Sequence, residues 1–96
     1  MKDKVVLITG GTSGIGLKAA ELFLDTGAAV IINGRDEEKG RKVLAFLKNK
    51  KPDGKIFFVA GDVSRVSDCE KIVKESAEIL GGIDILVNSA GIYFEK

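Results

Sequence analysis

The stretch TGGTSGIG occupies residues 9–16 and directly follows the apolar run VVLI of residues 5–8. Four of its eight residues are glycine, which tolerates positive φ angles and lets the main chain approach a ligand closely. When such a turn joins an apolar strand to a helix, main-chain N–H groups and the positive end of the helix dipole face one spot. The stretch therefore predicts a site for a phosphate group where the first helix begins.

The glycines of this stretch have distinct expected roles. Gly10 is expected to allow the turn, Gly14 to let the backbone approach a pyrophosphate, and Gly16 to let the helix pack closely on the strand. A glycine-rich turn with no ligand is the alternative interpretation. A P-loop is excluded because Leu17 and Lys18, rather than Lys and a hydroxyl residue, follow the last glycine.

The rest of the chain alternates between apolar runs and helical segments. Short runs rich in Val and Ile suit strands that are buried on both faces of a parallel sheet, and they cover residues 4–9, 28–34, 55–60 and 83–88. The predicted order is β-α-β-α-β-α-β. The predicted fold is α/β, a Rossmann-like three-layer αβα arrangement with a parallel sheet of four strands in the order 3-2-1-4. We expect one domain over residues 1–96.

The first two helical segments carry a periodic apolar face and end signals. The first is expected to end at Gly27, and its buried face is predicted to comprise Ile15, Ala19, Leu22, Phe23 and Thr26. The second is expected to use Asp36 as N-cap and to end before the turn at residues 52–54. Its inward residues are predicted to be Val43, Leu44 and Leu47.

The third helical segment opens with Ser-Asp-Cys-Glu at residues 67–70, which matches a capping box with Ser67 as N-cap. Gly81 and Gly82 are expected to end it. Its buried face is predicted to comprise Cys69, Ile72, Val73, Ala77 and Leu80.

Composition narrows the classes of partner and location. The 96 residues are 45% hydrophobic and 30% charged, with a net charge of +1, as in a soluble globular protein. Without a concentrated basic surface, nucleic acid and anionic membrane are not expected partners. The chain has one cysteine and no histidine. This predicts a reducing cytoplasmic setting, no disulfide, no histidine catalysis and no metal site.

Three motifs together resemble the short-chain dehydrogenases/reductases. Residues 9–16 match the family pattern T-G-x-x-x-G-I-G at every fixed position, and Asp62-Val63 follows the third strand as it does in that family. Residues 88–91 read Asn-Ser-Ala-Gly where the family has N-N-A-G. The resemblance implies NAD(P)-dependent oxidoreduction of alcohols and carbonyls.

The resemblance also implies cofactor contacts. Asp62 would accept a hydrogen bond from the adenine amino group, and Val63 would offer main-chain groups beside it. Asn88, Ala90 and Gly91 would border the nicotinamide ribose, whereas the serine at position 89 departs from the pattern. Capping of local N–H groups by Asp62, and bracing of the sheet end by Asn88, remain alternatives. The predicted cofactor-binding residues are Gly10, Thr12, Ser13, Gly14, Ile15, Gly16, Arg35, Asp62, Val63, Asn88, Ala90 and Gly91.

The choice between NADP and NAD depends on the end of the second strand. NAD-specific enzymes of this fold carry an acidic residue there, which binds the ribose 2′-hydroxyl. This chain has Gly34 and then Arg35, and a guanidinium can hold the 2′-phosphate of NADP through paired hydrogen bonds. Ser13 or Thr12 could add a hydroxyl. NADP(H) is therefore favoured, NAD(H) stays possible, and a solvated loop charge is the alternative role for Arg35.

The family's catalytic residues are not found in this sequence. The family uses a serine after the fifth strand and a Tyr-x-x-x-Lys pair on the next helix. Tyr93 and Lys96 are three residues apart rather than four and follow the fourth strand, so we regard them as a coincidence. We predict no catalytic residue, and we expect a truncated cofactor-binding part that does not catalyse by itself.

The fourth strand is expected to form an apolar edge of the sheet, which favours association. Self-association or pairing with a complementary C-terminal segment is predicted. Two other classes remain open: a dinucleotide-binding module without turnover, and an assembly or interaction protein that retains the fold.

Overall fold

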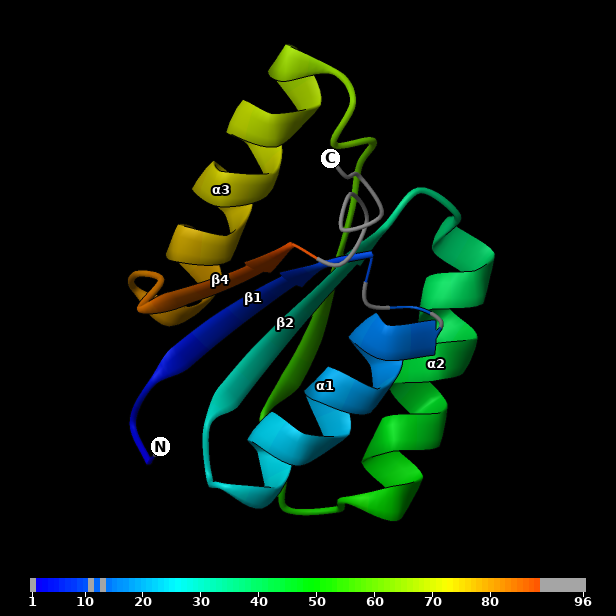
Figure 1. Ribbon diagram of the computed structural model, residues 1–96, viewed down its shortest axis with the longest axis vertical. Helices are drawn as coiled ribbons and strands as arrows, with labels where there is room; N and C mark the ends of the chain where they lie inside the picture. Colours follow the sequence, from blue (N-terminus) through cyan, green and yellow to red (C-terminus); the bar gives the residue numbers. More distant parts are fainter. Residues whose placement is uncertain (1, 11, 13, 89–96) are drawn as a thin grey trace.

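The computed structural model describes residues 2–10, 12 and 14–88, which form one parallel sheet with helices on both faces (Figure 1). Its elements are β1 (Val5–Thr9), α1 (Gly14–Asp25), β2 (Ala29–Gly34), α2 (Glu37–Lys50), β3 (Ile56–Ala60), α3 (Val66–Leu80) and β4 (Ile85–Asn88). The strand order is β3-β2-β1-β4, and every neighbouring pair is parallel. The predicted fold class and strand order are confirmed.

The strands end at the predicted residues but begin one or two residues later. The largest shift is at β4, which begins at Ile85 rather than at residue 83. Asp84 lies just before it and exchanges two hydrogen bonds with Val5. The Asp84 Oδ2 accepts from the Val5 amide at 2.8 Å, and the Asp84 amide donates to the Val5 carbonyl at 2.9 Å.

The central strands are covered on both faces because alternate side chains point to opposite sides of the sheet. Val6 and Ile8 of β1 belong to the apolar cluster beneath α1 and α2, whereas Leu7 belongs to the cluster beneath α3. Ile32 and Ile31 of β2 divide in the same way. Figure 1 shows α1 and α2 on one side of the sheet and α3 on the other. This double burial explains why these strands are continuous apolar runs.

The buried face of α1 is displaced from the predicted one. Ile15 is 67% exposed and Leu22 is 56% exposed, whereas Gly16, Ala20 and Leu24 are buried. The small side chains at 16 and 20 let the helix axis approach the sheet, so the contact stripe centres on them. The larger residues beside the stripe then lie on the outer side of the helix.

The end of α1 is built as expected, although one residue has a different role. Gly27 adopts a φ of 90° and donates its amide to the Leu24 carbonyl at 3.0 Å. Ala19 and Phe23 are partly buried against the core. Thr26 is exposed, and its hydroxyl donates to the Phe23 carbonyl at 2.6 Å. Thr26 therefore follows the helix and hydrogen-bonds to its last turn, and it does not belong to the buried face.

The start of α3 differs from the predicted capping box. The helix begins at Val66, with Arg65 in the N-cap position and no side-chain cap. Ser67 is therefore inside the helix. The Asp68 Oδ2 accepts a hydrogen bond from the Asp62 amide at 2.8 Å, outside the helix. The capping-box prediction failed because the hydrogen bonds at the start of α3 involve the turn after β3, which the helix sequence alone does not reveal.

Most of the predicted inner face of α3 is confirmed. Ile72 is 1% exposed. Three other residues of this face are partly buried, namely Cys69, Ala77 and Leu80. Val73, however, is 51% exposed, and it lines a groove beside β4. Gly81 ends the helix in the left-handed conformation, with a φ of 80°.

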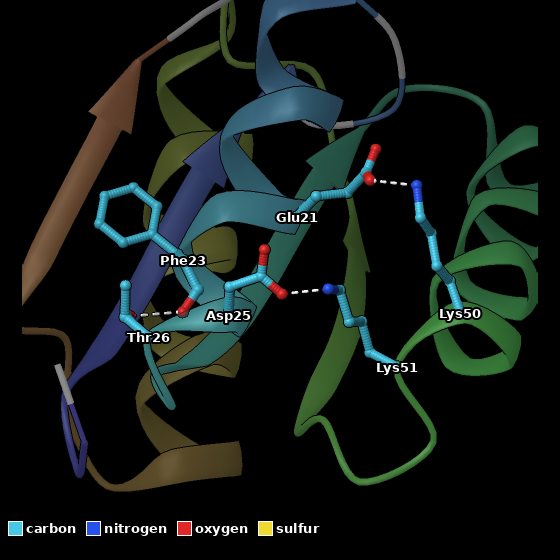
Figure 2. A network of polar contacts seen from close by, with 6 residues as sticks. All are labelled: Glu21, Phe23, Asp25, Thr26, Lys50 and Lys51. Carbon is cyan, nitrogen blue, oxygen red and sulfur yellow. Dashed lines mark hydrogen bonds and ion pairs between the residues drawn. The ribbon is translucent and has the colours of Figure 1, made fainter.

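Two ion pairs join the ends of α1 and α2 (Figure 2). Lys50 Nζ lies 2.6 Å from Glu21 Oε1, and Lys51 pairs with Asp25. The hydrogen bond from Lys50 is the main reason why the pKa of Glu21 lies below its usual value. Within the described part of the chain, no helix has the length and apolar character needed to cross a membrane.

The close packing of α2 on β3 yields a stability prediction. A Cβ atom at Gly40 would overlap the ring of Phe58, which packs directly on the helix backbone. Gly→Ala in an open helix position stabilises by about 1 kcal/mol, but overpacking costs about 1–3 kcal/mol. We expect Gly40→Ala to lower the free energy of unfolding, as measured by urea denaturation.

The matched control for this prediction is a double-mutant cycle with Phe58→Leu. The smaller side chain should relieve the overlap, so Gly40→Ala should cost less in the Phe58→Leu background. Equal or higher stability of the single Gly40→Ala variant would contradict the packing argument.

Candidate functional site

A pocket of about 420 Å³ lies at the carboxyl ends of β1, β2 and β3. In parallel α/β sheets, ligands bind in the crevice outside these strand ends. Its lining residues are Gly10, Thr12, Asn33, Gly34, Arg35, Asp36, Lys39, Gly61, Asp62, Val63 and Ser64. Five of them belong to the predicted cofactor-binding set, so the topology brings much of that set together.

The glycine turn has the backbone that its sequence predicts. Gly10 and Gly14 have φ angles of 70° and 58°, in the left-handed region that favours glycine. Gly16, in the first turn of α1, is buried as expected, and Ile15 beside it is exposed. The turn therefore leaves main chain accessible where α1 begins.

Gly34 needs to be glycine for lack of space. A Cβ atom there would lie 2.8 Å from Thr12 Cγ2 and 3.1 Å from Thr12 Oγ1, and Phe58 would be 3.6 Å away. Thr12 thus occupies the place where an acidic side chain at the end of β2 would have to begin. The packing at Gly34 therefore disfavours any residue with a carboxylate side chain at this position.

Two cations line the pocket next to Gly34. Arg35 and Lys39 are both exposed, and neither forms an ion pair with any residue in the described ranges. Arg41, further along α2, pairs instead with Glu37 at 3.0 Å. Sequence reasoning missed Lys39, because its place beside Arg35 in the pocket depends on how α2 begins after the end of β2.

Asp36 also lines the pocket, but the helix uses its side chain. The Asp36 Oδ1 accepts a hydrogen bond from the Lys39 amide at 3.1 Å. Its extended backbone is typical of an N-cap. The prediction that Asp36 starts α2 is confirmed, and this carboxylate is committed to the helix end.

Asp62 is held in a tight turn after β3. Its Oδ1 accepts hydrogen bonds from the Ser64 hydroxyl at 2.7 Å and the Ser64 amide at 2.9 Å. These bonds, with smaller effects of Arg35 and Arg65, hold the pKa of Asp62 below its ordinary value. Local capping, the alternative left open by the sequence, is therefore present. The adenine contact of Asp62 stays a prediction.

Two supporting residues were missed by sequence reasoning. Asn33 is 2% exposed, and its Nδ2 donates to the carbonyls of Val59 at 3.0 Å and Gly61 at 3.2 Å. Asp68 accepts from the Asp62 amide. The sequence signal for Asn33 is its polar side chain inside an otherwise apolar run. A buried polar side chain needs a hydrogen-bond partner, so such a residue points to a specific contact. Asp68 lies inside the predicted capping-box motif of residues 67–70, which gives it no role of its own.

The Asn88 side chain braces the end of the sheet. The Thr9 hydroxyl donates to Asn88 Oδ1 at 3.0 Å and thereby links the ends of β1 and β4. The bracing alternative is therefore present, and contact with a cofactor stays a prediction. Several residues named from the sequence lie outside the described ranges, namely Ser13, Ala90, Gly91, Tyr93 and Lys96.

The chemistry of the pocket fits the adenine, ribose and phosphate part of a dinucleotide. The cations Arg35 and Lys39 suit a phosphate ester, the ionised Asp62 suits an amino group, and the main chain at Gly10 and Gly14 suits a pyrophosphate. Within the described ranges, no group of three or more cysteine or acidic side chains is arranged to hold a metal ion.

Comparison with curated proteins finds related oxidoreductases. The chain is 51% identical over 91 residues to an uncharacterized oxidoreductase of Thermotoga maritima, covering 95% of this chain and 35% of that protein. It thus spans about a third of the length of the curated relatives that it matches.

Solved structures agree with this fold. An NADPH-bound short-chain oxidoreductase from Pseudomonas aeruginosa, which contains an atypical catalytic centre, superposes with a TM-score of 0.89 at 37% identity, covering 93% of this chain and 35% of that one. The L-sorbose reductase of Gluconobacter frateurii, complexed with NADPH and L-sorbose, has a TM-score of 0.89 at 34% identity, covering 100% and 36%.

The family model for short chain dehydrogenases matches residues 4–96, nearly the whole sequence. Together with the glycine turn and the sheet topology, this match shows that the chain belongs to the short-chain dehydrogenase/reductase family of oxidoreductases.

Proposed function

We propose that the chain is the cofactor-binding part of an oxidoreductase that acts on alcohol or carbonyl substrates. It prefers NADP(H) over NAD(H) and has no turnover of its own. The observation that carries this proposal is the pocket in which Gly34 is packed against Thr12 and flanked by Arg35 and Lys39. When bound, the nicotinamide cofactor supplies or accepts a hydride.

The proposed placement of the cofactor follows the order of groups along the strand ends. The adenine lies beside Asp62 and Val63 after β3, and the 2′-phosphate lies between the two cations after β2. The pyrophosphate lies over the turn at residues 10–16, where Thr12, Ser13 and Ile15 belong to the predicted set. The nicotinamide ribose lies toward Asn88 at the end of β4, and contacts with Ala90 and Gly91 are proposed from the sequence motif alone.

The NADP preference has a steric and an electrostatic basis. An acidic residue at the end of β2 selects NAD by binding the ribose 2′-hydroxyl, and at Gly34 such a residue would have to displace the Thr12 side chain. Arg35 offers a planar pair of donors, which suits a phosphate. Two neighbours in the comparison, the Pseudomonas aeruginosa and Gluconobacter frateurii proteins, were solved with NADPH, which supports the same choice here.

Arg35→Ala tests the electrostatic part of this proposal. Loss of a charge-assisted pair of hydrogen bonds should weaken NADPH binding about tenfold, whereas NADH binding should change little because it lacks the 2′-phosphate. Isothermal titration calorimetry with both cofactors measures this difference. Lys42→Ala is the matched control, since Lys42 lies on the helix that follows Arg35, has its Nζ 3.8 Å from Glu38 Oε1, and does not line the pocket. Equal losses for NADPH and NADH on Arg35→Ala would contradict the assignment.

Gly34→Asp tests the steric part. The new side chain must displace Thr12, and its carboxylate should repel a 2′-phosphate and attract the 2′-hydroxyl. We expect the ratio of NADPH to NADH affinity to fall about tenfold or more. Gly34→Ala serves as the control because it introduces the same clash without the charge. An unchanged ratio in Gly34→Asp would contradict the proposed position of the ribose.

The proposal includes the setting of the chain. We propose that residues 1–96 form one dinucleotide-binding unit and that it works in the cytoplasm, where its single cysteine stays reduced. The Cys69 thiol is partly buried and donates to the Val63 carbonyl at 3.0 Å. A structural role for this thiol agrees with a reducing setting.

We also propose that the chain self-associates through the side of the sheet that carries β4. Among the described strands, β4 pairs only with β1. A groove of about 220 Å³ lies beside it, where Leu86 is 61% exposed and Val73 is 51% exposed. An uncovered apolar edge is a template for pairing with another chain.

Sedimentation velocity tests this association. The chain should form a concentration-dependent oligomer, and Leu86→Lys should weaken it because a charge on the edge opposes burial. Leu22→Lys, on the exposed side of α1, is the matched control and should have no effect. A strictly monomeric chain at high concentration would contradict this part of the proposal.

A further inference from the structure

The turn after β3 is held by several elements at once. The Gly61 amide donates to the Gly34 carbonyl at 3.0 Å, and the Gly61 carbonyl accepts from Asn33 Nδ2. The Asp62 carbonyl accepts from the Arg65 amide at 3.0 Å. The main chain that enters this turn is therefore fixed by β2 and by the turn itself.

The first turn of α3 supplies the remaining contacts through two consecutive side chains. Asp68 Oδ2 accepts from the Asp62 amide at 2.8 Å, and the Cys69 thiol donates to the Val63 carbonyl at 3.0 Å. A carboxylate in the first turn of a helix usually stabilises that helix end. Asp68 instead reaches back to the main chain of the pocket wall.

These contacts decide which groups remain for a ligand. The amide and hydroxyl of Ser64 already donate to Asp62 Oδ1, and the Cys69 thiol already donates to the Val63 carbonyl. The groups left to meet an adenine edge are the second carboxylate oxygen of Asp62 and the Val63 amide. The Asp62 carboxylate oxygen can accept from the adenine amino group, and the Val63 amide can donate to the adjacent ring nitrogen.

We propose that Asp68 is a positioning residue for cofactor recognition, because its hold on the Asp62 amide sets the direction in which Asp62 and Val63 meet the adenine. This inference rests on the proposed dinucleotide binding. Without Asp68, a partly buried amide would lose its acceptor, and the peptide that joins Gly61 to Asp62 would be held on one side only, by the bond from Asn33 Nδ2 to the Gly61 carbonyl at 3.2 Å. The acceptor and donor would then no longer face the base together.

The experiment compares NADPH with its hypoxanthine analogue, in which an oxo group replaces the adenine amino group. The wild-type chain should prefer NADPH about tenfold or more, since the analogue opposes both Asp62 and the Val63 amide. Asp68→Ala should reduce this preference to about threefold or less. Asp68→Asn keeps an acceptor oxygen and should restore most of the preference. Calorimetric titration measures all three ratios.

A ligand-independent readout accompanies the titration. Amide hydrogen exchange by NMR should speed up at Asp62 in Asp68→Ala but not in Asp68→Asn. Asp84→Ala is the matched control, because Asp84 makes the same kind of bond to the Val5 amide at the other end of the sheet. It should speed exchange at Val5 and leave the base preference unchanged.

The outcomes separate the two proposals. A wild-type chain that binds neither nucleotide would overturn the proposed function, and with it the basis of this inference. A wild-type chain that prefers NADPH, and an Asp68→Ala variant that keeps this preference, would overturn the role of Asp68 alone. Faster exchange at Asp62 with an unchanged preference would show a structural bond only and would overturn it as well.

Discussion

The two central strands, β1 and β2, are buried on both faces, and this burial constrains the rest of the structure. A polar side chain inside such a strand needs a partner or costs free energy, so the strands are apolar until they approach their carboxyl ends. Since all four strands are parallel, those ends meet at one edge. Polar side chains are tolerated at this edge of the sheet, and the pocket lies along it.

Asn33 is a buried polar residue in a central strand, and it meets this constraint through hydrogen bonds. It is 2% exposed, one residue before the end of β2, and its amide nitrogen is satisfied by two carbonyls at the end of β3. The same bonds fix the position of Gly61, the residue that leads into Asp62. Satisfaction of one buried polar group thereby builds part of the pocket wall. Further along this wall, α3 contributes Asp68 and Cys69, so the wall is shaped by three separate elements.

Much of the fold follows from local pattern. Continuous apolar runs predicted the strands, and their alternation with helices predicted the order 3-2-1-4. The cap at Asp36 and the end at Gly27 were also predictable, because each depends on residues close in sequence. The buried face of α1 was not, since the choice of Gly16 and Ala20 over Ile15 and Leu22 depends on how closely the helix meets the sheet.

Motifs in the sequence nominated the glycine turn, Arg35 and Asp62, and the structure places Gly10, Arg35 and Asp62 on one pocket, while their cofactor contacts stay predictions. Lys39, Asn33 and Asp68 escaped sequence reasoning because their importance arises from neighbours in space. The fit of Thr12 against Gly34 is likewise invisible in the sequence. Family membership gives the class of cofactor, whereas these packing contacts support the choice among cofactors.

We propose that the pocket at the ends of β1, β2 and β3 receives the adenine and phosphate part of NADPH. The most direct measurement is a two-dimensional amide NMR titration of the isotope-labelled chain with NADPH. We expect saturable shifts concentrated at Gly10, Gly34, Arg35, Asp62 and Val63, with little change at the opposite end of the sheet. Shifts centred elsewhere, or none at saturating NADPH, would contradict this proposal.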